Sequence, residues 1–242
     1  MPNHIFKSDD NVRVTFSLDG DEYQIEHVVL SHMESLGFHG WSYKSMIEER
    51  GYSNTYLVTL HFGKEYVLKF IKASAAPSKE SMLNEISIQD KASHLDIAPK
   101  IMFAFTFELG SVILMEYVGI TLEKYLVDNV DHLKYMTIFI EVLAIVNKMH
   151  DNFIYHCDLH FGNLTFNTKG DGKIYIIDFG LSVAKEQVDH TLMCDDYDAL
   201  VDGGEYLYSK YEYPEFIMLQ DIISQYFNRR FTQTFDTLSY RV

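Results

Sequence analysis

The sequence predicts an α+β fold, with a five-stranded antiparallel sheet and one helix in the first half and a mainly helical second half. Two observations lead to this prediction. Short apolar runs separated by turn residues fill the first half of the chain, as expected of strands. Longer stretches with apolar residues at helical spacing follow in the second half. At 242 residues and 47% hydrophobic content, the chain can bury a core of this size.

The first elements are predicted to precede the sheet. Residues 12–18 and 23–25 alternate between apolar and polar positions around Asp19-Gly20-Asp21, a pattern typical of a hairpin. A short helix over residues 28–36 is expected to end at Gly37. Residues 1–42 therefore read as an N-terminal extension.

The five strands of the sheet are then predicted from alternating apolar runs. The last two strands are expected to pair across the turn residues 108–111. A helix is predicted between the third and fourth strands, beginning after Pro77-Ser78 with Ser78 as its N-cap and ending near Ala92. The strands are expected at residues 43–48, 56–62, 65–71, 100–107 and 112–117.

The second half opens with Thr121, whose hydroxyl is placed to cap a helix that starts directly after it. A long amphipathic helix is predicted over residues 133–149. A hairpin should follow, with strands at 164–166 and 174–177 and the turn between them.

The chemistry of the chain is concentrated on either side of this hairpin. Asp158 and Asn163 lie five residues apart before it, and Asp178 directly follows its apolar return strand. Folding the hairpin brings Asn163 and Asp178 to the same end. Metal-assisted phosphoryl transfer needs this set, because one carboxylate orients a hydroxyl or takes its proton while an amide and a second carboxylate hold Mg²⁺. The two segments read His156-Cys157-Asp158-Leu159-His160-Phe161-Gly162-Asn163 and Asp178-Phe179-Gly180.

These two segments, in this order and with this spacing, resemble the catalytic loop and the metal-binding motif of the protein-kinase-like superfamily. The resemblance implies a two-lobed fold. It also implies ATP and Mg²⁺ as cofactors, with Asp158 as the catalytic carboxylate and Asn163 and Asp178 as metal ligands.

The upstream half of the chain agrees with this resemblance. Lys69 interrupts an apolar strand, where an unpaired charge is costly. Glu85 follows sixteen residues later within the predicted helix. A strand Lys paired with a Glu of the next helix positions ATP phosphates in kinases, so we expect Lys69 and Glu85 to form this pair.

The segment at residues 49–57 stands where kinases carry a glycine-rich phosphate loop, but it departs from the Gly-x-Gly-x-x-Gly pattern. Only Gly51 remains, and Asn54 stands at the third glycine position. Asn is the residue besides Gly that best tolerates a positive φ. By resemblance, Gly51, Ser53 and Asn54 would contact the phosphates through backbone N–H groups and the Ser53 hydroxyl.

The strand at 112–117 and the residues after it look like the segment that joins the two lobes of a kinase. By resemblance, the backbones of Glu116 and Val118 would bond the edge of the adenine. Met115 would be the bulky residue behind the adenine. The predicted domains are then the extension at 1–42, an N-lobe at 43–118 and a truncated C-lobe at 119–242.

The short C-terminal part points to one branch of the superfamily. Only 62 residues follow Gly180, and no Ala-Pro-Glu appears. The loop form with His160 two residues after Asp158, where common Ser/Thr kinases place Lys, belongs to the atypical small branch. That branch includes the small kinase of the KEOPS tRNA-modification complex, RIO kinases, aminoglycoside and choline phosphotransferases, and small viral Ser/Thr kinases. The resemblance assigns His160 to the catalytic set.

Charge and composition limit the partners. The formal net charge of −15 disfavours direct binding to nucleic acid or to an anionic membrane. No apolar stretch is long enough for a membrane span, and the polar residues 1–20 do not resemble a signal peptide. Cys157 and Cys194 are the two cysteines, too few for a disulfide framework. A cytoplasmic or otherwise intracellular location is therefore expected.

The sequence as a whole favours an ATP- and Mg²⁺-dependent phosphotransferase, a Ser/Thr protein kinase of an atypical minimal type. Two alternatives remain open. The chain is a pseudokinase or scaffold subunit that binds a partner protein, or it is a small-molecule kinase of the aminoglycoside or choline type. In the enzymatic cases the partner is a protein or small-molecule hydroxyl acceptor.

Overall fold

A computed structural model describes residues 34, 41–50, 53–60, 63–72, 79–107, 110–128, 132–168, 172–212 and 221–225. The predicted N-terminal hairpin lies outside these residues, and so does the predicted short helix apart from Glu34. The chain divides into two compact units. The first consists of Met1–Asp90 and Pro99–Tyr117, and the second of Lys91–Ala98 and Val118–Val242. Each unit is described by itself.

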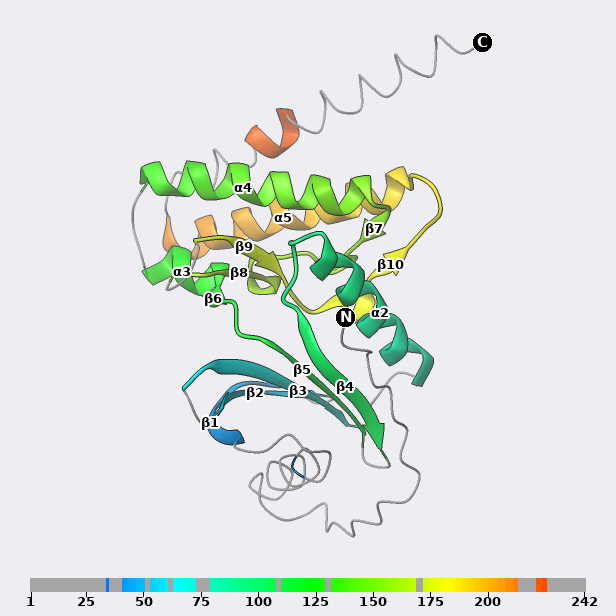
Figure 1. Cartoon of the computed structure of the whole chain (residues 1–242). Coiled ribbons are helices and arrows are strands. Elements are labelled where there is room, and N and C mark those ends of the chain that lie inside the picture. The colour runs from blue at the N-terminus through cyan, green and yellow to red at the C-terminus, as the bar shows by residue number, and fades with distance from the viewer. Residues whose placement is uncertain are drawn as a thin grey trace. The chain divides into compact units, whose positions relative to one another are not determined.

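The first unit is built on the predicted five-stranded antiparallel sheet (Figure 1). Its strand order is β1-β2-β3-β5-β4, and every neighbouring pair is antiparallel. Helix α2 (Lys79–His94) follows β3, as the sequence indicated. The strands are β1 (Trp41–Arg50), β2 (Ser53–Leu60), β3 (Glu65–Lys72), β4 (Ile101–Phe107) and β5 (Gly110–Glu116).

An apolar cluster holds α2 against the sheet. Ile86 of α2 packs with Ile71 of β3 and with Ile113 and Met115 of β5, and all four side chains are buried. Burial of each such side chain contributes roughly 1.5–3 kcal/mol. Glu85 lies next to Ile86 on α2, so this cluster also fixes the position of the Glu85 side chain.

Two turns of the first unit are tighter than predicted. Ser53 and Asn54 belong to β2, where they pair with Arg50 and Glu49 of β1. The strands were expected to end at residue 48 and to begin again at residue 56, but β1 continues to Arg50 and β2 begins at Ser53. Likewise, β5 begins at Gly110 and not after Ser111. A Cβ at Gly110 would lie 2.0 Å from the Ile71 carbonyl oxygen, so a glycine permits this close approach of β5 to β3.

The second unit contains the predicted helices and hairpin. Helix α4 (His132–Asp151) matches the predicted amphipathic helix and lies beside α5 (His190–Tyr211) (Figure 1). The two helices are joined by a 2.6 Å hydrogen bond from Tyr197 Oη of α5 to Asn147 Oδ1 of α4. The short elements are β6 (Ile120–Thr121), α3 (Leu122–Asp128), β7 (Ile154–Tyr155), η1 (Phe161–Asn163), β8 (Leu164–Phe166), β9 (Ile174–Ile176), η2 (Phe179–Leu181) and β10 (Val183–Ala184).

Two small sheets position the loops of this unit. The predicted hairpin is present as β8 and β9, and β6 pairs with the other edge of β8. The second sheet joins β10 to β7. Thr121 Oγ1 accepts a hydrogen bond from Lys124 N at 3.4 Å, so the predicted cap of α3 is confirmed. Among the residues described, no helix is both long and apolar enough to cross a membrane.

Candidate active site

The first unit carries a buried ion pair. Lys69 Nζ of β3 donates to Glu85 Oε1 of α2 at 2.6 Å, and the two residues are only 8% and 5% exposed. The predicted pairing is therefore present. Removing one partner of a buried pair would leave an uncompensated charge, which is strongly destabilising. The structure thus keeps a primary ammonium group at a fixed place on the sheet.

Two of the residues expected to contact phosphates, Ser53 and Asn54, lie at the start of β2. Ser53 and Asn54 are 4% and 2% exposed, and Asn54 does not adopt the positive φ that was expected of it. Asn54 Nδ2 donates to Tyr56 Oη at 2.8 Å, whereas Asn54 Oδ1 is buried without a hydrogen-bond partner. Gly51 lies outside the described residues. Contact of Gly51, Ser53 and Asn54 with a nucleotide stays a prediction.

The segment expected to contact adenine begins at the end of β5, at Glu116. Met115 is buried, and its Sδ lies 3.4 Å from Gln89 Nε2 of α2. The Glu116 N–H donates to the Lys100 carbonyl at 3.0 Å, so a ligand would have to use the Glu116 carbonyl. Val118 is 8% exposed and follows β5 without regular structure. The adenine contacts of Glu116 and Val118 stay predictions.

The second unit brings three predicted site residues together. Asn163 Nδ2 donates to the Asp158 carbonyl at 2.9 Å and lies 3.4 Å from Asp158 Oδ2. The Ile177 N–H donates to the Asn163 carbonyl at 2.9 Å, which places Asp178 directly after the residue bonded to Asn163. The β8–β9 hairpin produces this juxtaposition, as its turn residues and apolar runs predicted.

This arrangement fits a hard divalent cation. The Asn163 amide is oriented by its Nδ2 bonds to Asp158, which leaves the Oδ1 oxygen available. Together with the Asp178 carboxylate, it offers the oxygen ligands that Mg²⁺ prefers. Mg²⁺ usually takes one or two protein carboxylates and fills its remaining positions with water and phosphate oxygens. The described residues contain no cluster of three or more His, Cys, Asp or Glu side chains that could hold a metal.

Asp178 has an unusual backbone conformation. Its φ of 63° and ψ of 67° lie in the left-handed region, which is strained for a residue with a side chain. The buried Phe179 holds this turn, since its ring lies 5.3 Å from the His156 ring between centroids. His156 Nε2 donates to the Ile177 carbonyl at 2.9 Å. Burial lowers the pKa of His156, so the ring is a neutral donor. Strained residues held in this way are concentrated at functional sites.

His160 caps the turn η1. Its Nδ1 accepts a hydrogen bond from the Gly162 N–H at 3.1 Å, and its backbone is extended. The side chain is half-buried beside the catalytic loop. The structure therefore shows a structural contact for His160, and its predicted catalytic role stays a prediction.

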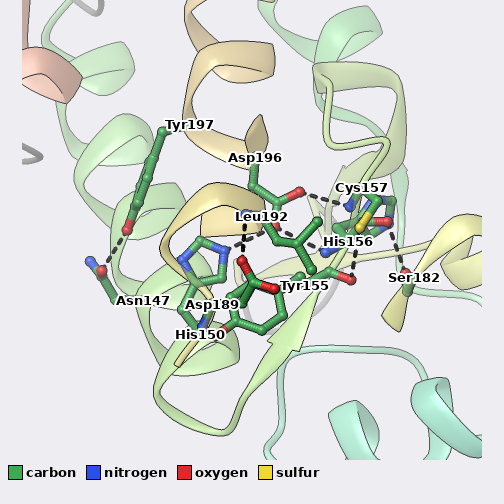
Figure 2. Close-up of polar contacts among 10 residues, drawn as sticks. All are labelled: Asn147, His150, Tyr155, His156, Cys157, Ser182, Asp189, Leu192, Asp196 and Tyr197. Atoms are coloured by element: carbon green, nitrogen blue, oxygen red, sulfur yellow. Dashed lines mark hydrogen bonds and ion pairs between the residues drawn. The ribbon is translucent and has the colours of Figure 1, made fainter. Parts of the chain in front are cut away.

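The sequence reasoning missed Asp196 of α5, which anchors the catalytic loop (Figure 2). This carboxylate is fully buried. Its Oδ2 accepts from the His156 N–H at 2.9 Å and lies 2.9 Å from His150 Nε2, and its Oδ1 accepts from the Cys157 N–H at 2.8 Å. Asp196 thus fixes the backbone two residues before Asp158. Helical spacing contained a signal, because Asp196 shares a face with Met193, Tyr197 and Leu200, all three of which are buried.

The short segment after Gly180 is tied to the same loop (Figure 2). Ser182 is 1% exposed, and its Oγ donates to the His156 carbonyl at 3.1 Å. Tyr155 Oη accepts from the Asp189 N–H at 2.7 Å, and Asp189 Oδ1 caps the first turn of α5. Between these points β10 pairs with β7. The segment is therefore fixed at both ends by hydrogen bonds within the chain.

Comparison with known proteins places this chain among the kinases. The family model described as protein kinase domain matches residues 44–207. Human myosin light chain kinase 3 is 30% identical over 127 residues, which are 50% of this chain and 15% of that protein. Human myosin light chain kinase family member 4 is also 30% identical over 127 residues, 32% of its length. A titin homolog of Caenorhabditis elegans is 28% identical over 126 residues, 1% of its length.

The features described above define a protein kinase fold. They are a sheet with a Lys–Glu pair and, later in the chain, a loop and a hairpin that bring Asp158, Asn163 and Asp178 together. The chain belongs to the protein kinase family, a family of phosphotransferases. It spans less than a third of the length of the curated relatives named above.

Proposed function

We propose that this chain is an ATP- and Mg²⁺-dependent protein kinase of a minimal type that transfers a phosphoryl group to a Ser or Thr hydroxyl. The observation that carries the proposal is the cluster in the second unit. The Asn163 side chain is hydrogen-bonded to Asp158, and the Asn163 carbonyl is bonded to the residue before Asp178. These are the base, amide and carboxylate that phosphoryl transfer requires.

Each residue of the cluster has a role that its chemistry supports. Asp158 orients the acceptor hydroxyl and takes its proton. Asn163 and Asp178 bind Mg²⁺, which when bound neutralises charge on the phosphates. Lys69, held by Glu85, supplies a cation to the nucleotide phosphates. The Asn163 bond to Asp158 also fixes the carboxylate, so that the base does not need to be ordered at the moment of reaction.

The names of the relatives support a protein acceptor, because the two human relatives are named as myosin light chain kinases. One observation favours a small-molecule acceptor as the second candidate. The segment between Gly180 and α5 has only the nine residues from Leu181 to Asp189. Ser182 bonds to the His156 carbonyl, β10 pairs with β7, and the Asp189 N–H bonds to Tyr155 Oη. That leaves little chain with which to bind an extended peptide.

The test is phosphoryl transfer from labelled ATP to a panel of protein, peptide, aminoglycoside and choline acceptors. Asp178→Asn is the matched variant, because it keeps the size of the side chain and removes a charge that Mg²⁺ needs. We expect the variant to fold and to lose transfer at saturating Mg²⁺. Transfer at the wild-type rate by Asp178→Asn would overturn the metal assignment.

A thermal-shift measurement separates this proposal from a scaffold that does not use ATP. A binder gains stability that grows with ligand concentration relative to the dissociation constant. We expect a rise in melting temperature with millimolar ATP and Mg²⁺, and a smaller rise in Asp178→Asn. No rise in the wild-type protein would favour the scaffold.

A further inference from the structure

The sheet of the first unit has two faces, and α2 covers one of them. Side chains alternate between the faces along each strand, and Ile71, Ile113 and Met115 lie on the face that packs with Ile86 of α2. The residues that alternate with these form the opposite face, called the far face below. By the register of the strands it consists of Asn54, Tyr56 and Val58 of β2, Tyr66, Leu68 and Phe70 of β3, and Val112 and Leu114 of β5.

The far face is covered along its whole length. None of its eight residues is more than 7% exposed. Even its polar corner is closed to solvent, because Asn54 Oδ1 is buried without a hydrogen-bond partner. A face open to solvent would let water bond to that oxygen. A second layer therefore lies on this side of the sheet.

The elements that the structure describes in the first unit do not supply this layer. Besides the five strands, they comprise α2, which lies on the other face, and the single exposed residue Glu34. A sheet face made of Tyr, Phe, Leu and Val has to be packed against another element. Most of the first unit that lies outside the described residues is in residues 1–40, which lead directly into β1.

The extension has the residue pattern that the far face requires. In the hairpin predicted for residues 12–25, apolar side chains alternate with polar ones, so one side of the hairpin is apolar. A two-stranded hairpin is at best marginally stable by itself in water, and this apolar side needs a partner as much as the far face does. The predicted strand at 12–18 has about the length of β2 and β3, which have eight residues each. The apolar side consists of Val12, Val14, Phe16, Leu18, Tyr23 and Ile25.

We infer that the far face is the docking surface for residues 12–25 of the same chain, which pack on it as a second β-layer. The segment is joined to the edge strand β1 and belongs to the same compact unit, so docking within the chain buries both apolar surfaces at once. The layer also supports β3 on both sides of Lys69, through Leu68 and Phe70. This inference goes beyond the proposed function and does not depend on phosphoryl transfer.

Methyl NMR of the full chain tests the contact directly. In protein labelled at Ile, Leu and Val methyl groups, we expect nuclear Overhauser effects from Val14 and Leu18 to Leu68 and Leu114. The methyl groups of Ile71 and Ile113 are the internal control, because they lie on the α2 face and should show no such effects. If Leu68 and Leu114 show no contact with residues 12–25, or show contacts with the second unit instead, the inference is overturned.

A pair of adjacent substitutions tests the energetics in the full chain. Phe16→Ala removes a large side chain from the apolar side of the predicted hairpin and should lower the melting temperature by about 10 °C. Ser17→Ala is the matched control, because residue 17 lies on the opposite, polar side, and it should lower the melting temperature by less than about 2 °C. Equal effects of the two substitutions would overturn the inference.

A second copy of the chain is the other occupant to distinguish. An isotope-filtered spectrum of mixed labelled and unlabelled chains detects contacts between chains only. We expect no effects between residues 12–25 and Leu68 or Leu114 in that spectrum, and a monomer in sedimentation. Contacts that appear there, together with a dimer, would replace docking within the chain by exchange between copies. None of these measurements uses ATP, so failure of the proposed function would leave their outcome unchanged.

Discussion

Replacing the buried carboxylate of Asp196 should strongly destabilise the fold around the catalytic loop. The side chain is fully buried and accepts from the backbone N–H groups of His156 and Cys157 and pairs with His150 Nε2. In Asp196→Ala these three donors lose their acceptor in a space that water does not reach. Each buried donor left unsatisfied costs about 1–3 kcal/mol.

The summed cost is large compared with the stability of a typical protein. Three lost acceptors suggest about 3–6 kcal/mol after some relaxation, against a total of about 5–15 kcal/mol for a folded protein. Asp196→Asn is milder. Its amide oxygen can replace Oδ2 and keep the contacts to His156 and His150, while its NH₂ faces the Cys157 N–H. We expect about 1–3 kcal/mol for this single lost acceptor.

Asp195→Ala is the matched control, because Asp195 is the preceding residue on the same helix and is exposed. Surface substitutions of this kind usually change stability by about 0.5 kcal/mol or less. Urea unfolding of the three variants measures the differences, and amide hydrogen exchange at His156 and Cys157 locates them. If Asp196→Ala destabilises the protein no more than Asp195→Ala, the anchoring role assigned to this carboxylate is wrong.

Three other predictions follow from the described contacts. Lys69→Met should weaken ATP binding, while Asp158→Ala should lower kcat with little change in ATP affinity. If calorimetry shows that the two variants lose ATP affinity equally, this division of roles is wrong. Phosphatase treatment should leave activity unchanged, and so should Thr191→Ala, which removes an exposed hydroxyl. A loss of activity after phosphatase treatment that Thr191→Ala reproduces would contradict this prediction. Burial lowers the pKa of His156 below its ordinary 6.5, so stability should be full above about pH 6.5 and fall as the pH drops toward the folded pKa. A melting-temperature profile between pH 8 and 5 that is equally steep in His156→Gln would refute this.

Contacts between residues close in sequence could be predicted, because local rules decide them. The β8–β9 hairpin is marked by two apolar runs and a polar turn, so its strands and the meeting of Asn163 with Asp178 followed directly. The Lys69–Glu85 pair was predictable for another reason. A Lys inside an apolar strand needs a partner, and the next helix supplied one.

Tertiary pairing overrode local preference at other places. Asn54 favours turns as an isolated residue, but in the structure it pairs with Glu49 of β1 and Phe70 of β3. Backbone bonds on both sides of β2 outweigh the small turn preference of one side chain. Asp196 was not predicted because its partners lie some forty residues earlier in the chain, a distance that sequence periodicity cannot span.

The contacts of Asp196 also explain why Cys157 can occupy its position in the motif. Cys157 has a φ of 62°, and its N–H is held by the Asp196 carboxylate. Burial, together with Asp196 and Asp195, raises the pKa of the Cys157 thiol to about 11. The surroundings of Cys157 are therefore anionic, which would repel a phosphate group instead of binding it. The segment from Ser182 to Asp189 is held by hydrogen bonds to Tyr155 and to the His156 carbonyl. Regulated protein kinases usually carry an Arg at this motif position, and that Arg orders the segment by pairing with a phosphorylated residue in it. Because uncharged bonds already order the segment in this chain, it needs neither that Arg nor the phosphate.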